Sequence, residues 1–117
     1  MAEIAVVTGA SSGIGAATSI ALANEGFQVI AAARRIDNLK KLEAEHKNIT
    51  AVELDVTNQA SVDKLAASLS GKPVSVLVNN AGGAFDGDSV LDSDPESWSK
   101  TYDVNVVGAV RVTKAIA

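Results

Sequence analysis

Apolar segments of two kinds alternate along the chain. Four short runs are rich in β-branched and other apolar residues, which is typical of parallel strands buried on both faces; they span residues 4–8, 28–33, 50–54 and 74–78. Between and after these runs, apolar side chains recur every three or four residues. This periodicity predicts helices over residues 14–25, about 36–42, 58–69 with Thr57 or Asn58 as the cap, and from about 97 onward.

The alternation of strands and helices predicts an α/β fold. Strands joined by helices form parallel βαβ units with right-handed crossovers. We therefore expect a doubly wound parallel sheet with strand order 3-2-1-4, in which the apolar strand 74–78 lies at an open edge. Residues 1–117 form one domain in this interpretation.

Composition excludes several classes of protein. Hydrophobic residues make up 47% and charged residues 21% of the chain, so a packed core is expected rather than disorder. A net charge of −4 argues against nucleic-acid binding, and the absence of cysteine excludes disulfides and thiolate metal sites, so no metal is expected. No apolar run has the ~20 residues of a membrane span. No lysine or arginine precedes Arg34, so no targeting peptide is expected and the cytoplasm is the expected compartment.

A glycine-rich turn, TGASSGIG from Thr8 to Gly15, lies between the first predicted strand and the first predicted helix. In this context Gly9 can form a tight turn, Gly13 can let the backbone approach a pyrophosphate, and Gly15 can let the helix pack closely on the strand. Free N–H groups at the helix start can then hold phosphates. The spacing differs from G-x-G-x-x-G, and a plain glycine-rich βα loop is the alternative. The residues expected to bind a dinucleotide here are Gly9, Ser11, Ser12, Gly13, Ile14 and Gly15.

The end of the second predicted strand indicates which dinucleotide is bound. A Rossmann domain that binds NAD carries an acidic residue there for the ribose 2′-hydroxyl, whereas this strand ends in Arg34 and Arg35, and Asp37 is the first carboxylate. The planar guanidinium group suits a 2′-phosphate. The pattern favours NADP, with a solvated basic helix start as the alternative. That alternative is weaker because the helix dipole disfavours cations at an N-terminus.

Four motifs in this order resemble those of the short-chain dehydrogenase/reductase family. They are the glycine turn, Asp55-Val56 after the third predicted strand, Asn79-Asn80-Ala81-Gly82 after the fourth, and Asn105 in the last predicted helix. No single motif is specific, but the four together are. The resemblance covers the whole chain and implies a Rossmann-fold, NADP(H)-dependent oxidoreductase. Such an enzyme moves hydride between nicotinamide and a small carbonyl or alcohol substrate, and is a homo-oligomer when complete.

The resemblance also implies roles for single residues. Asp55 would hydrogen-bond the adenine amino group with Val56 beside the ring; a strand-end cap is the alternative. Asn79 would brace the central sheet through its amide. The residues that would pass close to the cofactor are Asn80, Ala81 and Gly82. For them a simple turn is the alternative, which is disfavoured because ligands bind at the carboxyl edge of such sheets.

Asn105 is the one residue of this chain for which we expect a catalytic role. Its amide falls on an otherwise apolar helical face with Trp98, Tyr102 and Val112, and a buried amide needs partners. By resemblance it would help hold a water in the proton relay to a catalytic lysine. A satisfied buried amide or a helix kink is the alternative.

The tyrosine and lysine that the family uses for proton transfer are not found at the required spacing. Tyr102 precedes Asn105 and has Val106 four residues later, so we expect it to pack on the long helix. In this interpretation the chain is the N-terminal half of a dinucleotide-binding domain whose second half is absent. Two other hypotheses stay open: a non-catalytic NADP-binding module, and a structural half-domain that pairs with another chain.

Overall fold

Ten secondary-structure elements form the described part of the molecule. The computed structural model describes residues 3–11, 13–81 and 95–116; within the last range the side chains of Ser97, Trp98, Thr101, Val104 and Asn105 lie outside the description. The strands are β1 Ile4–Thr8, β2 Gln28–Ala33, β3 Ile49–Glu53 and β4 Val74–Val78. The helices are α1 Gly13–Asn24, α2 Asp37–Glu45, α3 Gln59–Ser68, α4 Pro95–Tyr102 and α5 Gly108–Ile116, with the π-helical turn η1 Asp103–Val107 between α4 and α5.

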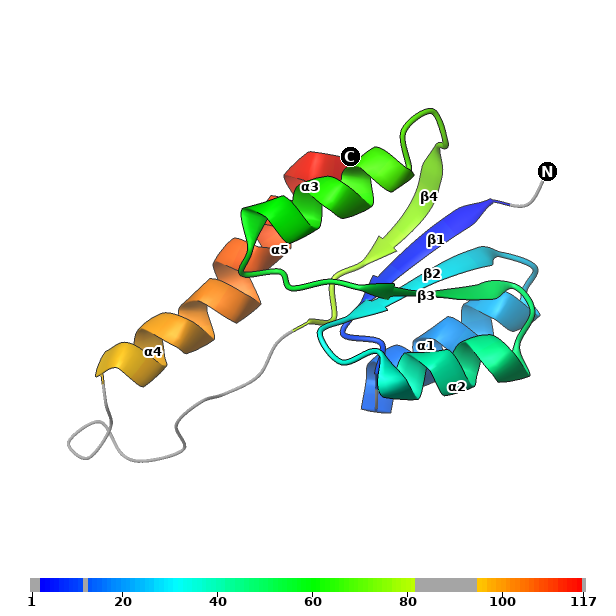
Figure 1. Cartoon of the computed structure of the whole chain (residues 1–117), viewed down its shortest axis with the longest axis horizontal. Helices are drawn as coiled ribbons and strands as arrows, with labels where there is room; N and C mark the ends of the chain where they lie inside the picture. Colours follow the sequence, from blue (N-terminus) through cyan, green and yellow to red (C-terminus); the bar gives the residue numbers. More distant parts are fainter. Residues whose placement is uncertain (1–2, 12, 82–94, 117) are drawn as a thin grey trace.

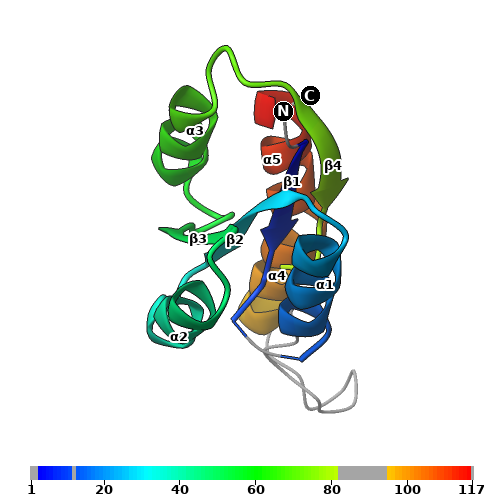
Figure 2. The same ribbon diagram turned by 90° about the vertical axis from the view of Figure 1, so that its right-hand side faces the viewer.

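The four strands form one parallel sheet in the order β3-β2-β1-β4. Helices α1 and α2 cover one face and helices α3 and α5 cover the other (Figure 1), and the view along a second axis separates the same layers (Figure 2). The expected α/β class, the doubly wound parallel sheet and the strand order are therefore confirmed. Element ends differ by one to three residues from the predicted ones.

Strand alternation divides the core between the two faces of the sheet. Successive side chains of a strand point to opposite faces, and β1 directs Val6 toward α3 but Val7 toward α1. The core on the α3 side consists of Val6, Ala32, Leu54, Val56, Val62, Leu65, Leu69 and Val112. The core on the α1 side consists of Val7, Ala10, Ala23, Val29, Ala31, Ala33, Leu39 and Ile49. Both faces are apolar, as the near-continuous apolar runs predict.

Local interactions explain where several elements begin and end. Asn58 caps α3 by accepting a hydrogen bond from the Ser61 N–H, so Asn58 rather than Thr57 is the cap. The small residues Gly15, Ser19 and Ala23 form the buried face of α1, which lets this helix lie close to the sheet. On the edge strand β3, the backbone N–H of Ala51 donates to a carboxylate oxygen of Glu43 at 2.8 Å, which satisfies one group of that exposed edge.

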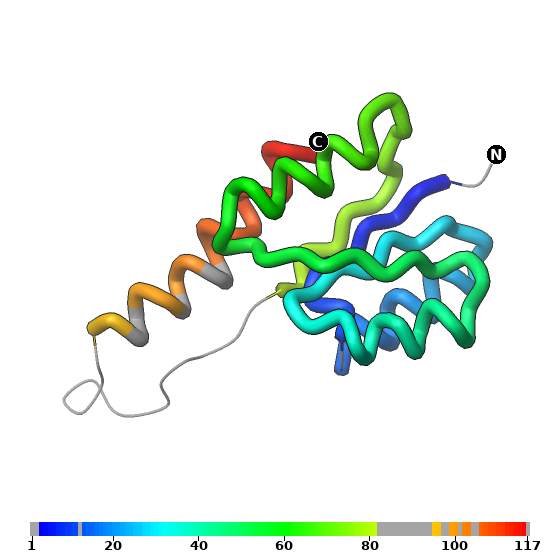
Figure 3. Tube along the Cα trace, viewed as in Figure 1, coloured from blue at the N-terminus to red at the C-terminus, as the bar shows by residue number. Residues whose placement is uncertain are grey.

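The last helical segment contains a feature that the periodicity did not predict. Residues 95–116 follow one continuous helical path (Figure 3), but η1 interrupts it. The N–H of Gly108 bonds the carbonyl of Asp103, five residues earlier, so one extra residue enters the turn. The register of the residues before η1 is therefore rotated relative to α5.

Tyr102 is exposed rather than packed, and our expectation for it was wrong. Its side chain is 60% exposed, whereas Val112 is fully buried. A helix rotates about 100° per residue, so the extra residue in η1 carries Tyr102 away from the face of Val112. In the described ranges, no helix is both long and apolar enough to cross a membrane.

Candidate nucleotide-binding site

A pocket of about 360 Å³ opens at the carboxyl ends of β1, β2 and β3. Small-molecule pockets commonly span ~300–1,000 Å³, and this edge is where open parallel sheets bind ligands. Three chain segments and one residue after β4 line it. The lining residues are Gly9, Ser11, Ala32, Ala33, Arg34, Arg35, Leu54, Asp55, Val56, Thr57 and Ala81.

Thr8, at the end of β1, connects the glycine turn to the segment after β4 through hydrogen bonds. Its hydroxyl oxygen accepts hydrogen bonds from the backbone N–H groups of Asn80 and Ala81, both at 3.0 Å, and donates to the Val78 carbonyl at 3.4 Å. A hydroxyl offers one donor and two acceptor positions, so all three are used. Thr8 is 1% exposed. It fixes the segment after β4 against the glycine turn.

Close backbone contacts explain two of the glycines in the turn. Gly9 has φ +63°, and a Cβ there would lie 2.7 Å from the carbonyl oxygen of Asn80. A Cβ on Gly15 would lie 2.1 Å from the carbonyl oxygen of Gly9 and 2.7 Å from Nδ2 of Asn80. That same amide donates to the Gly9 carbonyl at 3.1 Å. No side chain fits at either position, so the turn, α1 and the end of β4 lie in direct contact.

Gly13 differs, because a Cβ there would meet no atom of the described residues within 4 Å. Its φ of +61° still favours glycine, since L-residues rarely adopt this left-handed conformation. The neighbouring Ile14 is 76% exposed at the start of α1. No described residue therefore fills the space beside Gly13 at the start of α1.

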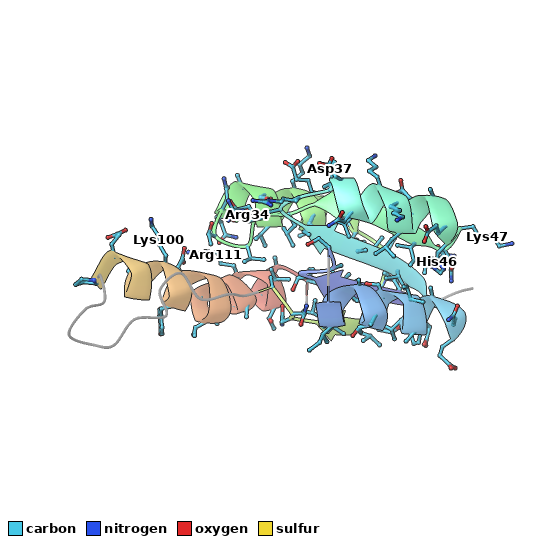
Figure 4. All side chains as sticks on the ribbon, turned by 90° about the horizontal axis from the view of Figure 1, so that it is seen from below. Arg34, Asp37, His46, Lys47, Lys100 and Arg111 are labelled. Carbon is cyan, nitrogen blue, oxygen red and sulfur yellow. The ribbon has the colours of Figure 1, made fainter. Side chains whose placement is uncertain are left out.

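Arg34 and Arg35 follow β2, and both are exposed where they line the pocket. Figure 4 shows Arg34 near the start of α2, where Asp37 is the first helical residue. The two arginines supply positive charge at the rim of the pocket.

The carboxylate of Asp55 lies across the pocket, directly after β3. Its Oδ1 accepts hydrogen bonds from the Thr57 hydroxyl at 2.5 Å and the Thr57 N–H at 2.9 Å. The pKa of Asp55 is lowered, first by the hydroxyl bond and then by the backbone bond and the charges of Arg34 and Arg111, against a desolvation that raises it. Asp55 is therefore ionised at neutral pH. Within the described part of the chain, both bonds to this carboxylate fall on Oδ1, which leaves Oδ2 to a ligand.

Helix α5 contacts the Asp55–Thr57 segment at Val56. A Cβ on Gly108 would lie 2.7 Å from Cγ2 of Val56, so this glycine allows the close approach of α5. Nη1 of Arg111 donates to the Val56 carbonyl at 3.0 Å. Val56 itself is 5% exposed and belongs to the core on the α3 side.

The structure brings most of the expected cofactor residues to one place. Those that line the pocket are Gly9, Ser11, Arg34, Arg35, Asp55, Val56 and Ala81. Gly15 and Asn80 contact Gly9 and support this surface, while Gly13 and Ile14 do not line the pocket and lie at the start of α1. Ser12 and Gly82 lie outside the described residues, as does the side chain of Asn105, whose backbone is part of η1.

Sequence reasoning missed some residues and misplaced one. Thr57, Gly108 and Arg111 were not expected at the site, and Thr8 was part of the glycine-turn motif but was assigned no role there. Asn79 was expected to brace the central sheet. Instead, its amide donates to the Thr113 hydroxyl at 3.0 Å and joins the end of β4 to α5.

Fold and site together define a Rossmann-type α/β domain with a pocket at the carboxyl edge of its sheet. The family model described as short chain dehydrogenase matches residues 3–117. The chain belongs to this family.

Relatives and solved structures agree with the assignment. Over 97% of this chain, an uncharacterised oxidoreductase of Mycobacterium tuberculosis is 52% identical, and 44% of its length is covered. An NADP-dependent 3-hydroxy acid dehydrogenase of Salmonella typhi is 34% identical over 97% of the chain, with 47% of its length covered. The structure of an actinorhodin polyketide ketoreductase with NADPH superimposes with a TM-score of 0.91 at 33% identity, covering 98% of this chain and 46% of that one. The chain spans about half the length of the relatives it matches.

Proposed function

We propose that this chain binds NADP(H) in the pocket at the carboxyl edge of the sheet, as the cofactor-binding part of an oxidoreductase. The observation that carries the proposal is the convergence of Gly9, Arg34 and Asp55. These residues follow three different strands and line one pocket. A glycine turn, a guanidinium and an ionised carboxylate are the groups that a phosphorylated adenine dinucleotide requires.

The pyrophosphate, the 2′-phosphate and the adenine each have a matching group in the pocket or at the start of α1. The N-terminus of α1 would hold the pyrophosphate, because φ at Gly13 is +61° and the helix dipole favours negative charge. The guanidinium groups of Arg34 and Arg35 would pair with the 2′-phosphate. Asp55 would accept a hydrogen bond from the adenine amino group, with Val56 beside the ring. The residues therefore fit the group, and NADP-dependent relatives support this choice of cofactor over NAD.

For the whole protein, the activity is hydride transfer between nicotinamide and a small carbonyl or alcohol substrate. The nicotinamide supplies the hydride chemistry when the cofactor is bound. Asn105, whose backbone is part of the turn η1, would contribute to the proton relay, and π-helical turns are frequent at functional sites. The complete protein works in the cytoplasm as a homo-oligomer. Relatives that are oxidoreductases support this activity.

The proposal is tested by measuring nucleotide affinity and turnover with the protein at its natural length. Isothermal titration is expected to show NADPH binding at least about tenfold tighter than NADH, because a charge-assisted contact contributes ~1.5–3 kcal/mol. Loss of the ultraviolet absorbance of reduced nicotinamide, measured with a set of small aldehydes and ketones, then reports hydride transfer. Failure to bind either nucleotide would overturn the proposal, and binding without any turnover would overturn its catalytic part.

A further inference from the structure

Arg111 joins two parts of the molecule that lie far apart in the sequence. From α5, its Nη1 donates to the carbonyl oxygen of Val56 at 3.0 Å, and its Nη2 donates to Oδ1 of Asp103 at 2.8 Å. The side chain of Arg111 is 22% exposed and that of Asp103 is 37% exposed. Figure 4 shows Arg111 on the long helix. One guanidinium thus holds a backbone carbonyl of the pocket wall and a carboxylate of its own helix.

The pair with Asp103 depends on the π-helical turn. Residues eight positions apart in a regular α-helix are ~12 Å apart along the axis and rotated by ~80° from each other. The extra residue in η1 makes this spacing equivalent to seven positions, which is about two turns and the same face. Asp103 can therefore hold the guanidinium in the orientation that reaches Val56.

The segment that Arg111 holds is the wall of the pocket. Leu54, Asp55, Val56 and Thr57 all line it. Gly108 and Arg111, one helical turn apart, both contact Val56. A Cβ on Gly108 would lie 2.7 Å from the Val56 side chain, and Arg111 donates a hydrogen bond to the Val56 carbonyl. A shift of the Val56 carbonyl would move the carboxylate of the neighbouring Asp55. The positive charges of Arg34 and Arg111 both attract this carboxylate.

We propose that Arg111 is a positioning residue for the adenine side of the pocket, acting through the Val56 carbonyl while Asp103 orients its guanidinium. The inference rests on the proposed function, since it assigns Arg111 a part in binding the adenine half of NADP(H). A planar fork is needed to serve two acceptors at once, which an ammonium group does not provide in the same geometry. A pair that only stabilised the helix would leave nucleotide affinity unchanged in the folded protein.

The test uses 2′,5′-ADP, which carries the adenine, the ribose and the 2′-phosphate but no nicotinamide. Its dissociation constant is measured by isothermal titration with the natural-length protein and with Arg111→Gln and Arg111→Lys. We expect Arg111→Gln to bind about tenfold more weakly, as the loss of a charge-assisted hydrogen bond would produce. Arg111→Lys should recover only part of this loss. Asp103→Asn should weaken binding in the same direction and provides the test if Arg111→Gln does not fold.

Two control variants separate positioning from general stability. Lys114→Gln removes an exposed charge one turn further along α5. Asn48→Ala removes hydrogen bonds to the carbonyls of Ala23 and Phe27 at the opposite end of the strands, so it destabilises the fold away from the pocket. Both controls should bind 2′,5′-ADP like the unmodified protein. Equal affinity in Arg111→Gln, or an equal loss in Asn48→Ala, would overturn the inference, whereas no binding by the unmodified protein would overturn the proposed function instead.

Discussion

The hydroxyl oxygen of Thr8 lies 3.0 Å from the backbone nitrogen of Asn80, and this bond joins the ends of two neighbouring strands across 72 positions of sequence. A second bond, from the Ala81 N–H, falls on the same oxygen. The glycine turn after β1 and the segment after β4 are therefore held in a fixed relation before any ligand arrives. Such preorganisation lowers the entropic cost of binding.

Thr8→Val should destabilise the protein, because it leaves two partly buried backbone N–H groups without their acceptor. Each unsatisfied group costs ~1–3 kcal/mol, so we expect a loss of about 2 kcal/mol or more in the free energy of unfolding, measured by urea denaturation. Thr8→Ser keeps the hydroxyl and should lose less than about 1 kcal/mol. Equal losses in the two variants would show that the hydroxyl bonds contribute nothing.

Gly15→Ala should be among the most damaging small substitutions in the chain. The added Cβ would lie 2.1 Å from a backbone oxygen, which can move only if the turn moves with it. We expect a loss of at least about 3 kcal/mol in unfolding free energy, or failure to accumulate as folded protein.

Gly13→Ala is the matched comparison, since a Cβ there meets nothing within 4 Å. Its positive φ costs ~1–2 kcal/mol, so this variant should fold but be measurably weakened. The proposed pyrophosphate position predicts that it binds NADPH more weakly even when folded. A Gly13→Ala protein as unstable as Gly15→Ala would contradict the described geometry of the turn.

The decrease in unfolding free energy at acid pH should depend on Asp55 and Thr57. The pKa of Asp55 lies below its ordinary value of 3.8, so its stabilising contribution is present above pH 3.8 and is lost as pH falls through the lowered pKa. Thr57→Val removes the largest cause of the lowering and should raise the pKa of Asp55, measured by NMR titration of its carboxyl group. The gap in unfolding free energy between the unmodified protein and Thr57→Val should shrink below pH 3.8.

Thr57→Ser keeps the hydroxyl and serves as the control for this prediction. It should retain the lowered pKa of Asp55 and the same pH dependence as the unmodified protein. A stability gap for Thr57→Val that stays constant from neutral to acid pH would contradict the role of the hydroxyl bond.

The fold could be predicted because its determinants are local and periodic. Uninterrupted runs such as Ile4–Thr8 indicate buried parallel strands, and Asn58 is a local cap for α3. The strand order then follows from the glycine turn, which indicates a Rossmann-type sheet. The expected cofactor residues that line the pocket were found for the same reason, because the carboxyl ends of parallel strands share one edge.

The parts that sequence did not predict depend on distant contacts or on a change of period. The two residues whose N–H groups donate to Thr8 lie 72 and 73 positions away in the sequence, so no local pattern indicates them. The extra residue in η1 leaves the apolar spacing of α5 intact while rotating Tyr102 onto an exposed face. The same insertion creates the pair of Arg111 with Asp103, eight positions apart, which regular helical spacing does not place together.

The most direct test of the central claim compares the affinities of Arg34→Ala for NADPH and for NADH. Isothermal titration with the natural-length protein gives both dissociation constants, and Lys41→Ala on α2 controls for the loss of one exposed charge. We predict that Arg34→Ala weakens NADPH binding by ~1.5–3 kcal/mol while NADH binding changes little. Equal losses for the two nucleotides, or none for either, would contradict the assignment of this pocket to NADP(H).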